Sequence, residues 1–313
     1  MAKIRKPVND YAVYLAVRLV VCVLQALSLA KARAFARLLA RLAYRIDPRH
    51  REVARDNLRH AFPAASEAAI DRHVRAVYRH FCTVLVEIVQ IPRRLHVNNW
   101  RRHLELVHGG RIVGGLTATR PVGTPRAMLL VTGHFGNWEM AGYALGLSGF
   151  RTYAVARRLD NPHLDQFLAR FRSGTGQTIL DKNADYERIQ QVLRDGGTIA
   201  MLSDQDAGPR GMYVDFFGRP ASTFKSIALL ALEYNAALVV VGVPKVGEPM
   251  RYQVVAEEVI LPEEYAHRPD AAKAITQRFT AALERLVRRD PRQYFWLHRR
   301  WKHQPPARKA KAA

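Results

Sequence analysis

The chain has 313 residues, of which 49% are hydrophobic, enough to bury the core of one large α/β domain with or without an appendage. Its 49 Lys and Arg against 27 Asp and Glu give a net charge of +22, which favours a polyanionic partner: a nucleic acid, an anionic membrane or an acidic protein. Two cysteines, Cys22 and Cys82, exclude a disulfide framework and a cysteine metal site. The absence of a zinc finger or an aromatic RNA-binding signature argues against a nucleic acid partner.

The N-terminus has the composition of a membrane anchor. A mostly apolar span runs from Tyr11 to Ala30, and cations at helical spacing follow it: Lys31, Arg33, Arg37, Arg41 and Arg45. The span is about as long as a bilayer core requires, although Arg18 interrupts it. A membrane-spanning helix and an in-plane amphipathic helix both remain open. A buried helix of a soluble protein is the weaker interpretation, because cations flank the span.

The rest of the chain begins with helices and then alternates. Residues 47–99 show helical periodicity, with one amphipathic stretch stopped by Pro63 and another that begins near Ser66. After Arg126 the pattern predicts strands at 127–131, 152–156, 198–202 and 237–243, an edge strand at 251–255, and helices at 138–147, 161–171, 185–193, 223–234 and 271–289. This alternation predicts an α/β fold with a largely parallel central sheet flanked by helices.

A histidine lies on the first strand-to-helix loop. His134 follows the strand at 127–131, and Asn137 is a good N-cap for the next helix, which carries Glu139 in its first turn. The helix dipole favours an ionised Glu139. An imidazole held by an ionised carboxylate acts as a general acid or base, so the pattern indicates a catalytic pair. A structural histidine with a glutamate five positions later by chance is the competing interpretation.

Two glycines flank this histidine. Gly133 and Gly136 would let the backbone approach a substrate closely, and free N–H groups at the start of the helix would receive an oxyanion. We therefore expect the oxyanion site at the start of this helix.

Polar residues also follow two later strands. Arg157 and Asp160 come after the strand at 152–156, and Asp204 comes after the strand at 198–202. Ligands of open parallel sheets bind at the carboxyl ends of strands, so these residues predict a cleft with a base, a cation and a second acid. Phe216 and Phe217 follow; they either line an apolar slot or pack in the core, which is the commoner use of paired phenylalanines.

These residues resemble the motifs of the bacterial lipid A late acyltransferases, the lauroyl/myristoyl acyltransferase family within the lysophospholipid acyltransferase-like superfamily. The resemblance covers nearly the whole chain, to about Lys302. The segments that carry it are Asn57-Leu58, Ala61-Phe62-Pro63, Gly133 to Glu139, Arg157, Leu159 to Pro162, Asp204-Gln205-Asp206, Phe216-Phe217-Gly218, Ala221, Thr223, Trp296 and Arg299-Arg300.

The resemblance implies acyl transfer from a thioester, on acyl carrier protein or coenzyme A, to a hydroxyl of a membrane glycolipid such as a lipid A precursor. His134 would deprotonate the hydroxyl, Glu139 would orient the imidazole, and Arg157 would hold a phosphate or the pantetheine arm. The substrate-binding residues would also include Asp160, Asp204, Phe216 and Phe217. No metal or other cofactor is implied, and the enzyme would lie on the cytoplasmic face of the inner membrane.

The family resemblance divides the chain into an anchor at residues 1–45, an acyltransferase domain at 46–302 and a disordered basic tail at 303–313. Three alternatives remain: an acyltransferase for another membrane lipid (a phospholipid, an aminolipid or a glycoside), a non-catalytic membrane-surface protein, and a cytosolic hydrolase of the same fold, which would leave the N-terminal span unexplained. The surplus cations have two explanations. They bind anionic lipid headgroups, or they capture an acidic acyl carrier protein through Arg72, Arg75, Arg79, Arg299, Arg300 and Lys302.

Overall fold

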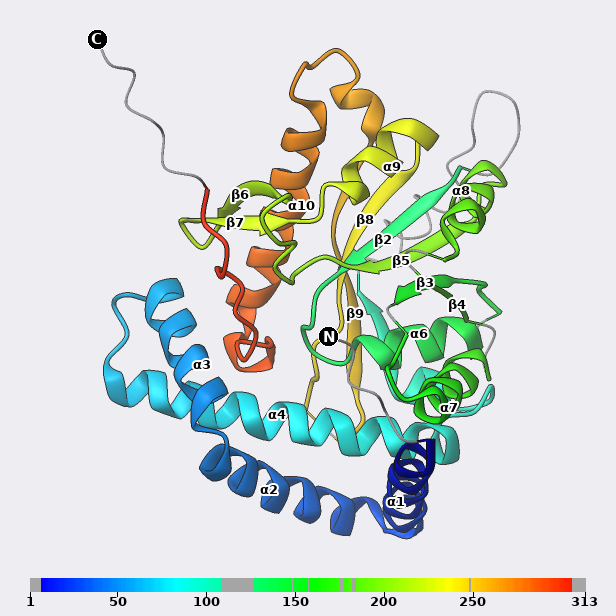
Figure 1. Cartoon of the computed structure of the whole chain (residues 1–313), viewed down its shortest axis with the longest axis vertical. Coiled ribbons are helices and arrows are strands. Elements are labelled where there is room, and N and C mark those ends of the chain that lie inside the picture. Colours follow the sequence, from blue (N-terminus) through cyan, green and yellow to red (C-terminus); the bar gives the residue numbers. More distant parts are fainter. Residues whose placement is uncertain are drawn as a thin grey trace.

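The computed structural model describes residues 7–107, 126–147, 149–156, 158–174, 177–181, 184–247 and 249–305. Seven strands form one sheet in the order β1-β9-β8-β2-β5-β3-β4, and β6 and β7 form a separate hairpin (Figure 1). The strands are β1 (Leu104–Val107), β2 (Met128–Thr132), β3 (Tyr153–Ala156), β4 (Thr178–Asp181), β5 (Thr198–Leu202), β6 (Met212–Phe216), β7 (Arg219–Thr223), β8 (Ala237–Gly242) and β9 (Tyr252–Ile260).

The sheet is largely parallel, as predicted. Every pair of neighbours runs parallel except β8 and β9, which are antiparallel. The expectation of an edge strand at 251–255 is wrong, because β1 pairs with the outer side of β9 and covers that edge. The polar residues of β9 misled the prediction, since alternation reports one solvated face and not the position of a strand in a sheet.

Helices cover both faces of this sheet. Along β2 the side chains alternate, with Leu129 and Val131 in one buried cluster and Met128 and Leu130 in another. The first cluster includes residues of α8 (Tyr186–Arg194), α9 (Ser226–Tyr234) and α10 (Ala271–Arg289), and the second includes residues of α6 (Trp138–Leu147). Phe171 of α7 (Pro162–Ser173) packs against the second cluster. This arrangement confirms the α/β fold.

Four helices precede the sheet: α1 (Pro7–Ala26), α2 (Leu29–Ile46), α3 (Pro48–Ala61) and α4 (Glu67–Arg94). The apolar span does not continue to Ala30, because the side chain of Ser28 accepts a hydrogen bond from the Lys31 N–H and begins α2. One segment, Val8–Ala26, is long and apolar enough to cross a membrane.

The last described segment packs against α4 and, through a bridge between Tyr294 and Phe135, reaches the loop after β2. Short 3₁₀ helices lie at η1 (Trp100–Arg102), η2 (Pro262–Tyr265) and η3 (Pro291–Gln293). The His303 ring bonds to the Asp206 carboxylate at 2.6 Å, and the division of the chain at residue 303 stays a prediction. Residues 306–313 lie outside the described part of the chain.

Candidate active site

His134 and Asp204 meet at the carboxyl ends of two neighbouring parallel strands. Thr132 of β2 lies opposite Leu202 of β5, so the residues two positions further along each strand are brought side by side. Nδ1 of His134 lies 2.8 Å from Oδ1 of Asp204, and the His134 N–H donates to Oδ2 at 2.7 Å. Both carboxylate oxygens are therefore used to fix the position of His134.

This pair is largely shielded from water, and each partner favours the charged form of the other. Burial alone would lower the pKa of His134, but the Asp204 carboxylate and, more weakly, Glu139 outweigh it and raise that pKa above the ordinary 6.5. Burial likewise favours the protonated form of Asp204, but the imidazole and the hydrogen bonds from His134 lower the Asp204 pKa below its ordinary range. With Nδ1 occupied by Asp204, Nε2 is the nitrogen available to a substrate.

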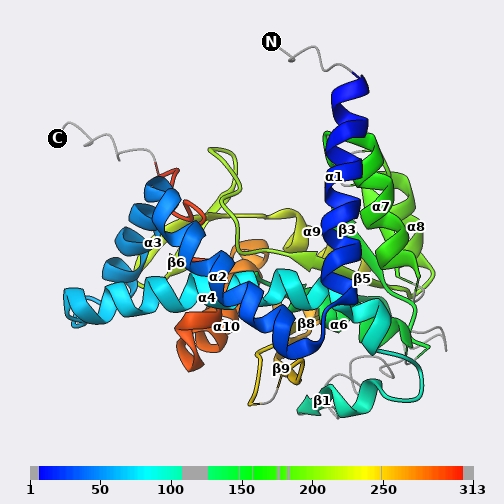
Figure 2. The same cartoon turned by 90° about the horizontal axis from the view of Figure 1, so that it is seen from below.

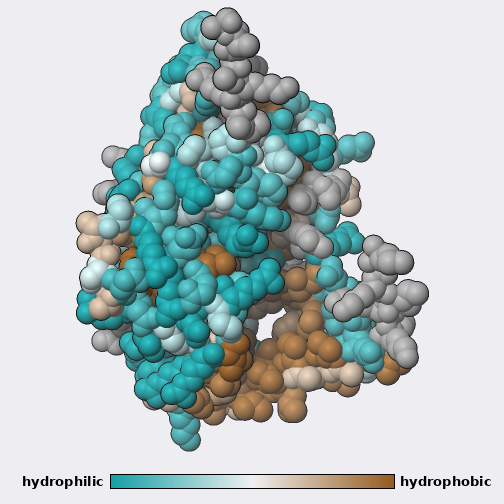
Figure 3. All heavy atoms as spheres, turned by 60° about the vertical axis from the view of Figure 1, so that its left-hand side comes forward, coloured by the Kyte–Doolittle hydropathy of each residue, from teal (hydrophilic) through white to brown (hydrophobic). Residues whose placement is uncertain are grey.

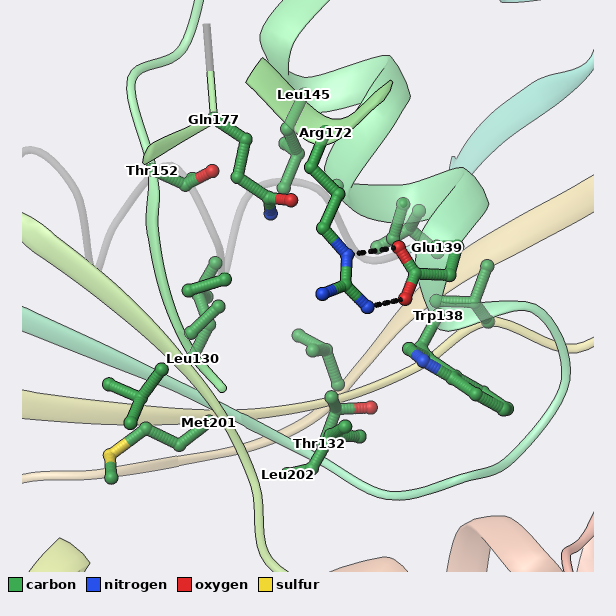
Figure 4. Close-up of a pocket in the computed structure, with 18 of the residues that line it drawn as sticks. Leu130, Thr132, Trp138, Glu139, Leu145, Thr152, Arg172, Gln177, Met201 and Leu202 are labelled. Carbon is green, nitrogen blue, oxygen red and sulfur yellow. Dashed lines mark hydrogen bonds and ion pairs between the residues drawn. The ribbon is translucent and has the colours of Figure 1, made fainter. Parts of the chain in front are cut away.

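Glu139 does not hold the imidazole, contrary to the role that the family resemblance implied. Its carboxylate forms a two-point ion pair with Arg172 of α7: Nε donates to Oε2 at 3.0 Å, and Nη2 contacts Oε1 (Figure 4). Glu139 is the second residue of α6, and Arg172 contacts both of its carboxylate oxygens, whereas Asp204 leaves β5 beside the histidine. The acid that orients His134 is thus Asp204, which the sequence had placed among the substrate-binding residues.

An apolar cavity of about 930 Å³, including the space at its mouth, lies between α6 and the sheet. Glu139, Arg172 and Trp138 line it at one end, and Met128 and Phe150 line it at the other. Figure 4 shows the Arg172–Glu139 pair at the edge of this space, with the third guanidinium nitrogen of Arg172 pointing into it. From Thr132 to Met128 the cavity follows β2 for four residues, or about 13 Å.

His134 lies next to this cavity. Its ring packs edge-on against Trp138, with ring centroids 4.7 Å apart, and Trp138 is one of the cavity walls. Phe295 packs on the imidazole with centroids 5.8 Å apart, and the Phe295 N–H donates to the His134 carbonyl at 3.0 Å. These aromatic rings leave the imidazole few alternative orientations.

Three backbone N–H groups of the loop before α6 are taken by protein acceptors. The N–H of His134 donates to Asp204, that of Gly136 donates to the Gln293 carbonyl at 3.0 Å, and that of Asn137 donates to the Val243 carbonyl at 2.8 Å. These amides hold the loop in place, and the oxyanion site at the start of the helix stays a prediction. Among the described residues that line the cavity, Arg172 carries the positive charge.

The two glycines serve the protein's own packing. A Cβ on Gly136, where φ is +66°, would lie 1.8 Å from the Val243 carbonyl oxygen, and a Cβ on Gly133 would lie 3.1 Å from the Asp204 side chain. Gly136 therefore fits the loop onto β8, and Gly133 makes room for the carboxylate that holds His134. At both glycines the atoms that approach the backbone closely belong to the protein itself.

The remaining predicted residues lie elsewhere. Phe216 and Phe217 are 2% and 5% exposed and pack in the core, each within 6 Å of a tryptophan ring, so the core interpretation is confirmed and the apolar slot is wrong. Asp160 is exposed in the turn before α7 and does not line the cavity. Arg157 lies outside the described residues.

Arg172 is the residue of this site that the sequence did not indicate. It lies 33 positions after Glu139, and only the packing of α7 beside α6 brings the two together. The sequence did contain a signal for Asp204. Residues that lie equally far beyond the ends of two adjacent parallel strands come side by side. This signal can be used only when the order of the strands in the sheet is known.

An acid–base pair beside a long apolar cavity, on a parallel α/β sheet, defines a class of enzyme that acts on acyl chains. The sequence profile of the bacterial lipid A biosynthesis acyltransferases matches residues 2–303, and the chain belongs to this family.

Several characterised relatives are similar to the chain. The lipid A biosynthesis lauroyltransferase of Escherichia coli (strain K12) is 26% identical over 277 residues, which cover 85% of this chain and 84% of that protein. The lipid A biosynthesis palmitoleoyltransferase of the same organism is 25% identical, covering 82% and 80%. The phosphatidylinositol mannoside acyltransferase of Mycobacterium tuberculosis (strain ATCC 25618 / H37Rv) is 28% identical, covering 60% and 59%.

Proposed function

We propose that this protein transfers a fatty acyl chain from a thioester to a hydroxyl of a membrane glycolipid, such as a lipid A precursor. The observation that carries the proposal is the His134–Asp204 pair beside an apolar cavity long enough for most of a fatty acyl chain. The relatives named for lipid A and for phosphatidylinositol mannoside support a glycolipid acceptor.

His134 acts as the general base in this mechanism. Asp204 holds Nδ1 in its protonated form, so Nε2 accepts the proton of the acceptor hydroxyl as the oxygen attacks the thioester carbonyl. The tetrahedral intermediate then breaks its carbon–sulfur bond, and the imidazolium returns the proton to the departing thiolate. The Asp204 carboxylate stabilises the imidazolium between these two steps.

Arg172 supplies positive charge at the cavity mouth. Its guanidinium is fixed by two contacts with Glu139, and its third nitrogen faces the cavity. We assign it to the thioester carbonyl, where a preorganised donor stabilises the oxyanion of the tetrahedral intermediate. Glu139 is then a positioning residue, which acts through Arg172 and through its attraction to the imidazolium.

The donor is a thioester of acyl carrier protein or of coenzyme A, and its acyl chain occupies the cavity. The carbon chain would pack against the apolar side chains of β2, β5 and α6, with its thioester near Arg172. Arg157 keeps its expected role of holding a phosphate or the pantetheine arm. The enzyme acts at the cytoplasmic face of the inner membrane, where a soluble thioester from the cytoplasm meets the lipid acceptor in the membrane.

The decisive experiment compares His134→Ala with the wild-type protein. Purified full-length enzyme receives acyl carrier protein and coenzyme A thioesters with a lipid A precursor in mixed micelles, and mass spectrometry detects the acylated lipid. We expect His134→Ala to lower turnover by roughly two to four orders of magnitude. The control is His73→Gln, because His73 lies on α4 and bonds to the Ala69 carbonyl, 2.8 Å away.

Near-native turnover by His134→Ala would refute the mechanism. Mass spectrometry of membrane lipids from cells that lack the protein then identifies the acceptor and the transferred chain. If lipid A were unchanged and another glycolipid had lost an acyl group, that glycolipid would be the acceptor, and the proposed acyl transfer would still hold.

A further inference from the structure

Helix α2 packs on the rest of the protein through one narrow face. Ala32, Ala36 and Ala40, spaced four residues apart, are 0–6% exposed and lie against α4 with Tyr44. Small side chains bring the two helices close together. Leu39 and Ala43 flank this face and are half-buried, and most of the remaining circumference of α2 is exposed.

One exposed row of α2 consists of arginines. They recur every fourth residue, and α2 contains no Asp or Glu; the row is Arg33, Arg37, Arg41 and Arg45. Three of these, with Arg75 and Arg79 of α4, line a groove of about 1040 Å³. Asp71, which contacts Arg75, also binds Arg55, and the described residues provide no ion pair for the four arginines of α2.

The neighbouring exposed row of α2 is apolar. Its members are large hydrophobic side chains that are exposed in the described structure: Phe35 (37%), Leu38 (61%), Leu42 (52%) and Ile46 (69%). A row of arginines beside a row of large apolar residues is the pattern of a helix that lies in a membrane interface, with cations at the headgroups and apolar residues below them.

Helix α1 extends this apolar surface. Figures 1 and 2 together show α1 and α2 lying along the same lower face of the molecule, with α1 seen end-on in Figure 1 and along its length in Figure 2. Hydrophobic residues gather along the lower edge in Figure 3, and Leu19 and Val23 of α1 are 67% and 53% exposed.

We propose that the lower face formed by α1 and α2 rests on an anionic membrane, and that the arginine groove between α2 and α4 binds the phosphates of lipid headgroups. The groove offers five guanidinium groups, which match phosphate oxygens in charge and in geometry. The apolar row of α2 enters the layer just below the headgroups. A membrane is the partner that satisfies both rows at once.

An acidic carrier protein fits these observations less well. It would neutralise the arginines, but it would leave the apolar rows of α1 and α2 in water. The C-terminal cations expected to join such a patch are also not all available: Arg300 is 2% exposed, and its guanidinium donates to the Ser222 carbonyl and to Thr223 Oγ1.

A vesicle-binding experiment tests the proposal with the full-length protein. The variant is Arg37→Gln/Arg41→Gln/Arg45→Gln, and the probes are vesicles of phosphatidylcholine alone or with an equal part of phosphatidylglycerol. Each cation at an anionic surface strengthens binding about fivefold, so we expect affinity for the anionic vesicles to fall on the order of 100-fold. Binding to the neutral vesicles should stay unchanged.

A matched control removes the same charge far from this face. Arg188→Gln/Arg194→Gln/Arg210→Gln changes three exposed arginines outside α1 to α4 and should leave both affinities almost unchanged. A second variant, Leu38→Gln/Leu42→Gln, should weaken binding to both kinds of vesicle, because it removes apolar contact and not charge.

Three outcomes would overturn the proposal. The first is wild-type affinity of the arginine variant for anionic vesicles, and the second is a loss of affinity no larger than that of the control variant. The third is a raised Michaelis constant for acyl carrier protein thioesters together with unchanged vesicle binding. The last would assign the groove to the carrier. Vesicle binding needs no turnover, so failure of the proposed acyl transfer would leave this test intact, and failure of this test would leave the reaction intact.

Discussion

At the scale of single residues, the site depends on which carboxylate holds the imidazole. Asp204 contacts His134 through both of its oxygens, whereas Glu139 contacts Arg172. The two acids therefore make different predictions about pH, because only the partner of the imidazole sets the protonation of the base.

Asp204→Asn should lower kcat by roughly two to four orders of magnitude and move the acid limb of the pH profile. In the wild type the raised pKa of His134 places the midpoint of kcat/KM above pH 6.5, with activity rising as the imidazole loses its proton. Removing the carboxylate lowers that pKa, so the midpoint should move to lower pH. The measurement is kcat/KM against pH for both proteins.

Asp206→Asn is the matched control, since Asp206 also holds a histidine, His303, at 2.6 Å. It should leave the midpoint where it is in the wild type. A loss of activity in Asp204→Asn with an unmoved midpoint would mean that Asp204 only supports the fold.

Glu139 and Arg172 should behave as one unit. Glu139→Gln and Arg172→Gln should each lower kcat, and Glu139→Asp should be milder, because it keeps a carboxylate. In a double-mutant cycle the combined variant should lose less than the sum, with a coupling of about 0.5–3 kcal/mol. Two results would contradict this view: additive losses in the cycle, or a shift of the pH midpoint by Glu139→Gln as large as that by Asp204→Asn. Either result would indicate that Glu139 orients the imidazole of His134.

At the scale of elements, periodicity predicted most of the fold. The helices at 138–147 and 271–289 and the strand at 198–202 have the predicted bounds, since strong apolar patterns and clear end signals define them. The strands β1, β4, β6 and β7 were missed, because β1 and β4 show little alternation and β6 and β7 pair only with each other. The strand order, which pairs His134 with Asp204, depends on contacts between distant segments and has no local signal.

The cavity between α6 and the sheet should set the length of the transferred chain. Ala200 lies midway along it, opposite Leu130 in the register of β2 and β5, and its small side chain leaves the cavity open. Ala200→Phe should therefore favour donors with shorter acyl chains, while the rate with a short-chain donor stays near that of the wild type. The measurement is kcat/KM over a series of chain lengths.

Ala200→Ser is the control, because it keeps the size of the side chain and should keep the preferred length. An equal loss for all chain lengths in Ala200→Phe would show that the chain does not pass this residue.

At the scale of the whole molecule, the position of α1 is the open question left by its composition. Length and hydropathy permit a membrane-spanning helix, but α1 stays in contact with the catalytic domain at both ends. Near its start, Asn161 donates to the Asp10 carbonyl at 2.8 Å, and near its end, Gln25 donates to the Val89 carbonyl at 3.1 Å. A helix that crossed the bilayer would carry Asn161 across with it, so the packing favours an in-plane helix.

Nitroxide labels on cysteines can decide between the two positions. Val8, Leu15 and Cys22 are seven residues apart and lie on one exposed side of α1, while Cys82 is buried and unreactive. The labels are attached to native Cys22 and, with Cys22→Ser, to Val8→Cys or Leu15→Cys, in full-length protein on anionic vesicles. An in-plane helix should give all three labels the same depth by collision with oxygen and with an aqueous nickel complex. A spanning helix would distribute the labels over about 21 Å along the bilayer normal, with the middle one deepest, and that result would contradict the in-plane position.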